Sequence, residues 1–172
     1  MRRSGCIACL ACASSALALV HASALRAGST SAAAQTMPCR VTIPPKDPAS
    51  NPAGPSFNHG NNVIRVSLYR RNGKLIAGRL PGGGKMATIN PDGSIDAKFG
   101  WWRVGRAKIR ISGRRLDAAA PPLRAHVPDG YGPGFQATGL TFPTTGCWKV
   151  TGKYLKSQIS FTLLVSKSRL GP

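Results

Sequence analysis

The chain has 172 residues, of which 24 are Lys or Arg and five are Asp, with no Glu, so its formal net charge is +19. This length allows one domain with a single core. So few carboxylates argue against glycoside hydrolysis, which needs two of them at a defined separation. The excess of cations predicts attraction to anionic partners.

The N-terminus has the pattern of a secretory signal peptide over residues 1–34. Arg2 and Arg3 form a positive start, and an uncharged apolar stretch follows from Gly5 to Val20. This stretch is shorter than the roughly 20 residues of a spanning helix. Small-residue cleavage sites follow at Ala22-Ser23-Ala24 and, better placed before a change in composition, at Ala32-Ala33-Ala34. We therefore predict a secreted or periplasmic protein that is cleaved after Ala34 and is soluble in its mature form.

Cleavage would remove three of the five cysteines, Cys6, Cys9 and Cys12. The alternatives to a cleaved signal peptide over residues 1–34 are a retained anchor, a twin-arginine signal and lipidation at Cys9 or Cys12. The two cysteines that remain, Cys39 and Cys147, form an even pair in an oxidising compartment, which favours a disulfide. Closing a loop of about 108 residues stabilises a fold by roughly 4–5 kcal/mol in the chain-entropy model. The alternative is a free catalytic thiol at Cys147.

The basic character persists in the mature chain. Cleavage also removes Arg2, Arg3 and Arg26, which leaves 21 of the 24 Lys and Arg against five Asp, a net charge of +16. Anionic polysaccharide, lipid head groups and wall polymer are the partners that this charge predicts. A basic surface that serves solubility alone is the alternative. Dedicated nucleic-acid binding is not expected, because no lysine run or RNA-binding signature is present.

Short strand signals recur through the mature chain, and no window has the spacing of an amphipathic helix. Residues 35–61 hold a first strand at Arg40–Ile43 and then a Pro/Asn-rich loop over 44–61, whose prolines remove backbone donors. The domain itself is expected over residues 62–168. Its expected strands are Val63–Tyr69, Lys74–Ile76, Met86–Ile89, Ile95–Phe99, Ala107–Ser112, Gln136–Phe142, Cys147–Lys153 and Ile159–Val165.

The strand pattern predicts the fold class. Val63–Tyr69 alternates, with Ile64, Val66 and Leu68 on one face, as in a strand with one buried face. Asn72-Gly73 follows and predicts a tight hairpin turn into the next strand. Many short strands at a spacing of roughly 8–12 residues predict an all-β, antiparallel, immunoglobulin-like β-sandwich. We expect it to be a monomer.

Three blocks of sequence carry a resemblance. The first is Asp92-Gly93-Ser94-Ile95 with Lys98-Phe99-Gly100-Trp101-Trp102-Arg103. The second is Ile111-Ser112-Gly113-Arg114-Arg115-Leu116-Asp117 with Ala120-Pro121-Pro122-Leu123. The third is Gly130-Tyr131-Gly132 with Gly134-Phe135-Gln136 and Phe142-Pro143-Thr144-Thr145-Gly146-Cys147-Trp148. Over roughly residues 60–166 the chain resembles a family of small secreted bacterial proteins of uncharacterised function with an immunoglobulin-like β-sandwich. The resemblance implies export and this fold, and it implies no activity. Lys149 stands where an acidic residue is expected, so no carboxylate role is carried over to it.

The competing class of protein is a cysteine enzyme. Thr144-Thr145-Gly146-Cys147-Trp148-Lys149 is faintly similar to the Ser-x-Gly-Cys-Ile-Arg motif of L,D-transpeptidases. A thiolate at Cys147 would need an imidazole base, but His59 lies 88 residues upstream and Cys39 offers an oxidation partner. Pro143-Thr144-Thr145-Gly146, followed by Trp148, loosely resembles a loop of chagasin-type peptidase inhibitors. We therefore expect a non-catalytic binding or structural protein, with these two classes as alternatives.

An aromatic and basic segment is the candidate binding surface. Adjacent strand residues point to opposite faces, so one of Trp101 and Trp102 can be exposed among arginines, where it would suit acidic sugars or polymers. The alternative is that both rings are packed. The candidate surface consists of Trp101, Trp102, Arg103, Arg106, Arg114 and Arg115. No metal or cofactor is predicted, because no His or Cys pair with metal-ligand spacing remains after cleavage.

Overall fold

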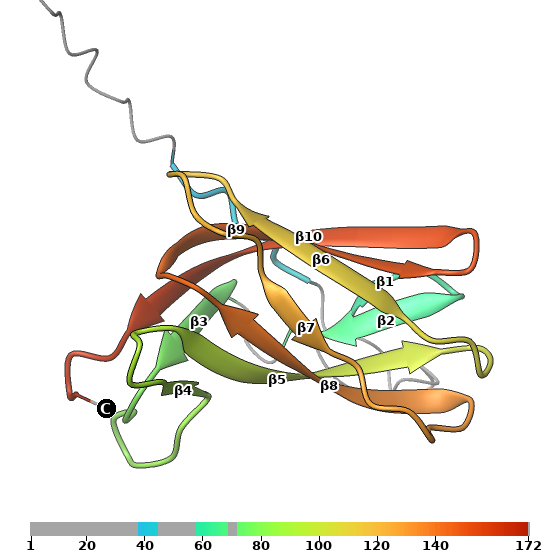
Figure 1. The fold of residues 1–172 in the computed structure, drawn as a ribbon, viewed down its shortest axis with the longest axis horizontal. Helices are drawn as coiled ribbons and strands as arrows, with labels where there is room; N and C mark the ends of the chain where they lie inside the picture. Colours follow the sequence, from blue (N-terminus) through green and yellow to red (C-terminus); the bar gives the residue numbers. More distant parts are fainter. Residues whose placement is uncertain (1–37, 45–57, 69–71, 172) are drawn as a thin grey trace, which may run out of the picture. The chain divides into compact units, whose positions relative to one another are not determined.

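The computed structural model describes residues 38–44, 58–68 and 72–171, and within them it is all β (Figure 1). The predicted leader, loop residues 45–57 and Tyr69 lie outside the described residues. No helix in the described part of the chain is long and apolar enough to cross a membrane. The strands are β1 (Asn58–Gly60), β2 (Ile64–Ser67), β3 (Lys74–Ala77), β4 (Ala87–Ile89), β5 (Ile95–Arg103), β6 (Arg110–Arg115), β7 (Arg124–His126), β8 (Gly134–Phe142), β9 (Gly146–Tyr154) and β10 (Ser157–Lys167).

Alternation of apolar and polar residues explains why these segments are strands. In β10, Ile159, Phe161, Leu163 and Val165 are buried, and the residues between them are partly exposed. In β2, Ile64 and Val66 are buried in the same way. A period of two places these side chains on one face. The inward faces expected from the sequence are therefore confirmed for both strands.

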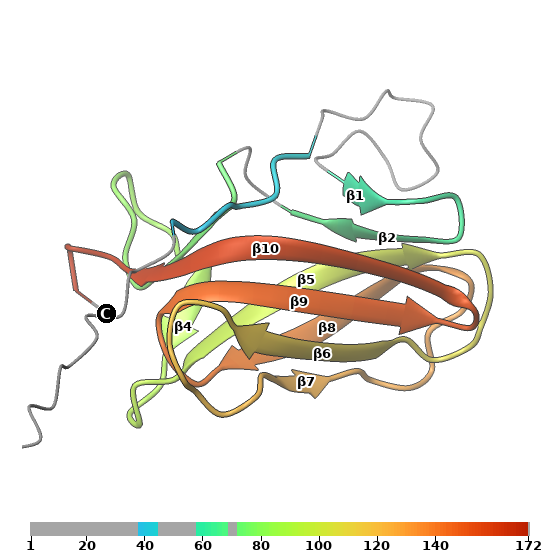
Figure 2. The same ribbon diagram turned by 90° about the horizontal axis from the view of Figure 1, so that it is seen from above.

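The strands form one mixed, open sheet that folds over onto itself. Its order is β1-β2-β5-β4-β3-β10-β9-β6, with β8 on the other edge of β5 and β7 beyond β8. Figures 1 and 2 show β6, β9 and β10 as one layer and β5 and β8 as a second layer that faces it. The layers are joined through β3 and β4, which pair at Ala77 and Ala87. Most of the core therefore lies between two halves of the same sheet.

Aromatic rings fill the space between the layers. The ring of Phe161 on β10 lies 6.0 Å from that of Phe99 and 6.1 Å from that of Trp101, both on β5. The rings of Phe142 on β8 and Trp148 on β9 are 5.6 Å apart. Such pairs contribute about 0.5–1.5 kcal/mol beyond the burial of their area. These contacts hold the two layers face to face.

The hairpin predicted at Asn72-Gly73 is wrong. β3 does not pair with β2; it pairs with β10 and β4, and β2 pairs with β1 and β5. Gly73 has a φ of 61°, and an added Cβ would lie 2.5 Å from Cβ of Val41. The glycine therefore permits the close approach of residues 38–44. The turn signal is local, whereas the partner of β3 is decided by side-chain packing in the core.

Three further predictions need correction. β3 is parallel to both β10 and β4, so the sheet is not purely antiparallel. Arg40–Ile43 is not a strand. Among the described residues, its hydrogen bonds to β10 are those of Thr42, whose N–H donates to Thr162 O at 2.7 Å and whose Oγ1 accepts from Thr162 N–H at 2.9 Å. Asn58–Gly60, at the end of the expected loop, pairs with β2 as β1.

Gly152 on β9 offers a test of the core. A Cβ at this position would lie 2.4 and 2.6 Å from two ring carbons of Trp101, which is buried. We expect Gly152→Ala to lower the free energy of unfolding by about 1–3 kcal/mol, because the added methyl group would press on a buried ring that is already packed against Phe161. Urea denaturation of the purified protein measures this. Gly132→Ala is the matched control, since nothing lies within 4 Å of the added atom. Equal urea midpoints for the two variants would contradict the packing of Trp101 on β5 against Gly152 on β9.

Candidate binding surface

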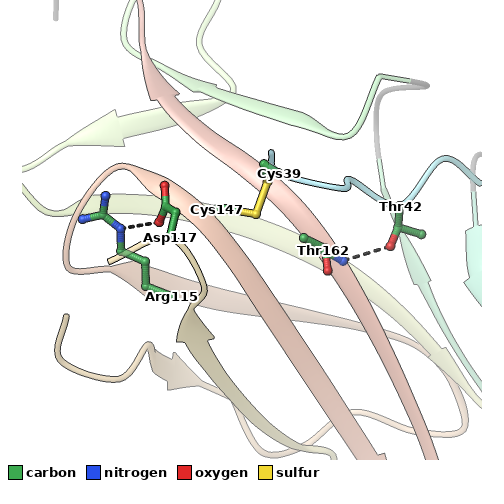
Figure 3. The surroundings of a disulfide bond; sticks show 6 residues. All are labelled: Cys39, Thr42, Arg115, Asp117, Cys147 and Thr162. Carbon is green, nitrogen blue, oxygen red and sulfur yellow. Dashed lines mark hydrogen bonds and ion pairs between the residues drawn. A yellow bond between two sulfur atoms is a disulfide. The ribbon is translucent and has the colours of Figure 1, made fainter. Parts of the chain in front are cut away.

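Cys39 and Cys147 form a disulfide, as the sequence predicts (Figure 3). Their Cα atoms are 5.4 Å apart, and 108 residues separate them along the chain. Cys147 is buried on the outer side of β9, beneath residues 38–44. Cys39 ties those residues to β9, and Thr42 ties them to β10. Both thiols are therefore consumed in holding the N-terminal segment on the sheet.

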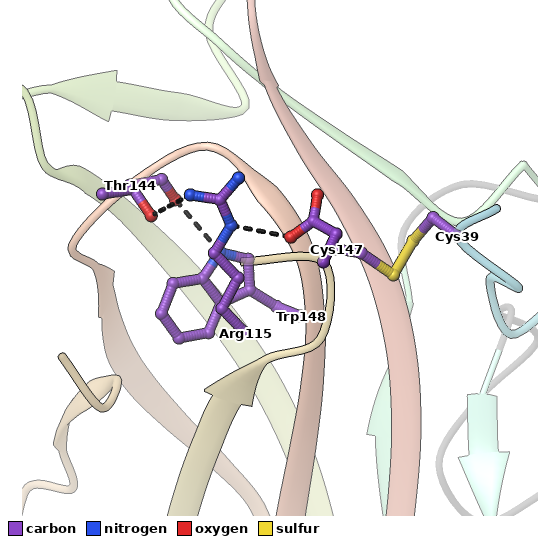
Figure 4. A network of polar contacts seen from close by, with 6 residues as sticks. Cys39, Arg115, Thr144, Cys147 and Trp148 are labelled. Atoms are coloured by element: carbon purple, nitrogen blue, oxygen red, sulfur yellow. Dashed lines mark hydrogen bonds and ion pairs between the residues drawn. A yellow bond between two sulfur atoms is a disulfide. The ribbon is translucent and has the colours of Figure 1, made fainter. Parts of the chain in front are cut away.

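The residues around Cys147 form a polar network (Figure 4). Arg115 Nε donates to Asp117 Oδ1 at 2.7 Å, and Arg115 Nη1 donates to Thr144 Oγ1 at 3.3 Å. Trp148 Nε1 donates to Thr144 O at 3.0 Å. A Cβ on Gly146, whose φ is 133°, would lie 2.4 Å from Arg115 Nε. Thr144, Gly146 and Trp148 therefore each contribute to the structure around the disulfide.

The polar network favours the ionised form of the Asp117 carboxylate. The hydrogen bond from Arg115 lowers the pKa of Asp117 below its ordinary 3.8, and the backbone amide of Cys147 lowers that pKa further. Asp117 is therefore ionised at neutral pH, close to Cys147.

His59 lies away from Cys147. Its Nε2 is 2.8 Å from Ser160 O, and its ring packs edge-on against Phe161. In the register of β9 and β10, Cys147 lies opposite Leu164, which is four residues beyond Ser160 along β10. Four residues of a strand span about 13 Å. The structure therefore does not bring the sequence-predicted thiol and imidazole together.

The candidate surface predicted from the sequence is divided among several places. Trp101 and Arg103 are 1% and 2% exposed and lie in the interior. Trp102 points outward from β5, opposite Phe135 of β8. Arg106 is exposed in the loop after β5, and Arg114 and Arg115 are on β6. Because β5 and β6 belong to opposite layers, the six residues do not form one surface.

A different group of cations lies together on the outer face of β6 and β9. Arg110 is directly opposite Lys153, and Arg114 is directly opposite Lys149. All four side chains are exposed. We call these four residues the cation ladder. The ladder was missed in the sequence analysis because only the pairing register of the strands reveals it, although each strand carries cations four residues apart, on the same face.

The cation ladder places like charges opposite each other without a carboxylate among its four residues to neutralise them. Like charges directly opposite in a sheet destabilise it by roughly 0.2–1 kcal/mol per pair. The ion pairs found among the described residues join Lys108 to Asp129 and Arg115 to Asp117, and neither includes a ladder residue. Neutral residues complete the face: Ser112 lies opposite Thr151 between the two cation pairs, and Gln158, Ser160 and Thr162 follow on β10. A bound anion would relieve the repulsion.

Comparison with protein-family models, curated proteins and solved structures finds no match for this chain. Within residues 38–44, 58–68 and 72–171, no three His, Cys, Asp or Glu side chains gather in a way that could hold a metal ion.

The disulfide is tested by removing it. We expect Cys39→Ala with Cys147→Ala to lower the free energy of unfolding by about 2–5 kcal/mol, because the unfolded chain gains the freedom of an open loop. Urea denaturation measures the loss, and treating the wild type with a reductant should reproduce it. Thiol titration of the unfolded, oxidised chain from residue 35 onward should detect no free thiol. A reactive thiol assigned to Cys147 would refute the pairing.

The Arg115–Asp117 contact predicts a pH dependence of stability. Because the pKa of Asp117 is lowered in the folded state, its contribution is present above the unfolded pKa and is lost as pH falls through the folded pKa. Asp117→Asn should therefore be less stable than wild type at pH 7, with a difference that shrinks as the solution is acidified below pH 4. Urea denaturation across this range measures the difference. A constant difference at every pH would contradict the assignment.

Proposed function

We propose that the protein is an exported, non-catalytic binding module with an immunoglobulin-like β-sandwich fold, which holds an anionic polymer of the cell envelope on its cation ladder. The observation that carries the proposal is the direct opposition of Arg110 to Lys153 and of Arg114 to Lys149, all exposed and with no carboxylate among them. An anion bound between each pair would neutralise two repelling charges at once.

The dimensions of the ladder suit a linear polymer. Residues two apart in a strand are about 6.6–6.8 Å apart, so the two cation pairs are separated by roughly 13 Å. Ser112 is exposed between the pairs and can donate a hydroxyl hydrogen bond to the same ligand, whereas the Thr151 hydroxyl lies 2.8 Å from Ser160 Oγ. The arginines suit bidentate contact with carboxylate, sulfate or phosphate groups, and the lysines act as point charges. A chain with regularly spaced anions can contact both pairs.

Several observations support a non-catalytic role. Cys147 is in a disulfide, and His59 bonds to β10. The described carboxylates have structural partners: Asp92, Asp96, Asp117 and Asp129 contact Ser94, Thr141, Arg115 and Lys108, respectively. The loop that resembles a chagasin-type inhibitor is held through Thr144, which accepts hydrogen bonds from Arg115 on β6 and from the Trp148 ring. No observation favours the transpeptidase or inhibitor alternative.

The proposal of export rests on the leader pattern and on the disulfide. Disulfides persist in oxidising compartments, and the arginine pair and apolar stretch before residue 35 are typical of signal peptides. The resemblance to small secreted bacterial proteins agrees with this. The two facing layers of the sheet support the sandwich class, although the parallel pairing of β3 departs from a purely antiparallel one.

Two neutralised variants test the ladder. Arg114→Gln with Lys149→Gln removes one cation pair, and the matched control, Arg79→Gln with Lys85→Gln, removes the same charge from exposed residues between β3 and β4. A cation at an anionic surface contributes about 1 kcal/mol, so the ladder variant should bind dextran sulfate about thirtyfold more weakly. The control should change little. Fluorescence titration at fixed salt measures the affinity of both variants for dextran sulfate. An equal loss of affinity in the two variants would refute the proposal.

The same ladder variant should be more stable than wild type at low salt. Removing a like-charged pair relieves roughly 0.2–1 kcal/mol of repulsion, and added salt should erase the gain by screening. If the ladder variant binds more weakly but unfolds at a higher urea concentration, its weaker binding does not come from loss of the fold. Urea denaturation at two salt concentrations measures this, and a ladder variant less stable than wild type at low salt would contradict the repulsion.

A further inference from the structure

Exposed apolar side chains gather at one end of the sheet. Among the described residues, five large apolar side chains are exposed, and three of them lie at this end: Val104 at 51%, Phe135 at 62% and Leu155 at 74%. They lie in or beside the connections β5–β6, β7–β8 and β9–β10, which occupy the right side of Figures 1 and 2 together with the β1–β2 turn. We call this end, formed by residues 61–63, 104–109, 127–135 and 154–157, the loop end.

Buried Arg103 holds two of these loops in place. Its Nη1 donates to Gly105 O, and its Nη2 donates to Tyr131 O at 3.2 Å. Its Nε donates to Gln136 Oε1 at 2.7 Å, and Gln136 Nε2 donates to Pro128 O at 2.9 Å. One cation in the interior therefore ties the β5–β6 loop to the β7–β8 loop.

The other two turns are attached to the same assembly. Asn61 Nδ2 donates to Ser157 Oγ at 3.0 Å, which joins the β1–β2 turn to the β9–β10 turn. Tyr154 packs against the β5–β6 loop, because a Cβ on Gly105 would lie 2.7 Å from its hydroxyl. The loop end thus presents its apolar side chains from connected turns.

Leu155 is poorly suited to its turn on backbone grounds. It has a φ of 52°, and among the described residues it alone is a non-glycine with positive φ. The left-handed region favours Gly or Asn and is disfavoured for Leu. Leu155 and Lys156 form the two-residue turn between the paired Tyr154 and Ser157. An exposed leucine does not stabilise the conformation of this turn. A contact with another molecule therefore explains the Leu155 side chain better.

Cations surround these apolar side chains. Arg106, Lys108 and Lys156 are exposed at the loop end, and Lys153 of the cation ladder is exposed next to it. The carboxylate described there, that of Asp129, is 2.9 Å from Lys108 Nζ. The remaining described carboxylates, Asp92, Asp96 and Asp117, lie at the opposite end of the strands. The loop end is therefore both apolar at its tips and positive around them.

We propose that the loop end docks onto an anionic lipid surface. Leu155, Val104 and Phe135 would enter the boundary between head groups and acyl chains, and the surrounding lysines and arginine would meet lipid phosphates. Trp102, outward and directly opposite Phe135, would lie at head-group level, where Trp is favoured. Apolar tips with a cationic surround match a bilayer surface better than they match a polymer. The inference is separate from the cation ladder, with which it shares Lys153.

Vesicle sedimentation of the chain from residue 35 onward tests the docking, since contacts group residues 35–172 into one compact unit. The probes are phosphatidylcholine vesicles with and without phosphatidylglycerol. The wild type should bind the vesicles that contain phosphatidylglycerol, and high salt should weaken the binding. Leu155→Asn should reduce the partition coefficient about tenfold by removing an inserted side chain. Asn tolerates the left-handed conformation, so this variant should fold.

Leu170→Asn is the matched control, because Leu170 is also an exposed leucine (57%) and is outside the loop end. It should bind vesicles as the wild type does. Lys156→Gln should weaken binding about fivefold on anionic vesicles and leave binding to neutral vesicles unchanged. Failure of the wild type to bind, wild-type binding by Leu155→Asn, or an equal loss in Leu170→Asn would each overturn the proposal.

Dextran sulfate binding separates this inference from the cation ladder. Leu155→Asn should retain polymer binding, and Arg114→Gln with Lys149→Gln should retain most vesicle binding. Loss of both activities in both variants would overturn the separate loop-end site. Polymer binding without vesicle binding in the wild type would leave the ladder standing and refute the lipid docking.

Discussion

In β9, successive side chains point to opposite faces of the sheet, and both the core and the candidate binding surface depend on that alternation. The inward set, with Trp148 and Gly152, seats the rings of Phe142 and Trp101 from the facing layer. The outward set carries Cys147 and the lysines of the ladder. A shift of one residue in register would exchange the two sets. The disulfide, the core and the basic face are therefore coupled through one strand.

Arg103 plays a comparable part at the end of the sheet. Its guanidinium lies in the interior, where its hydrogen bonds run to carbonyl oxygens of Gly105 and Tyr131 and to the side-chain oxygen of Gln136. A buried charge is expensive unless it is hydrogen-bonded, so these acceptors hold the loops in place as much as the arginine does. The sequence places Arg103 next to Trp102, which suggested a surface residue. Its actual position explains how loops that carry exposed apolar residues stay ordered.

Several features were predictable because they depend on local patterns. The alternation in Val63–Tyr69 and Ile159–Val165 is a property of each segment by itself, and the structure confirms both inward faces over the described residues. The Cys39–Cys147 pairing followed from a count of cysteines. The Asn72-Gly73 hairpin failed for the opposite reason: a turn signal limits the path of the chain over a few residues, but it does not choose the partner of the following strand. β1 was missed because three residues in a Pro-rich context carry little pattern.

The sequence by itself determined the all-β class and most strand positions, which follow from residue type and spacing along each segment. It also determined the disulfide partners and the strongly basic character, which follow from counts of residue types. Only the tertiary structure decided which residues share a surface. It buried Trp101 and Arg103, separated them from the arginines of β6, and placed Arg110 and Arg114 opposite Lys153 and Lys149. These juxtapositions depend on strand register and on the facing of two layers, and both arise from contacts between residues far apart in the chain.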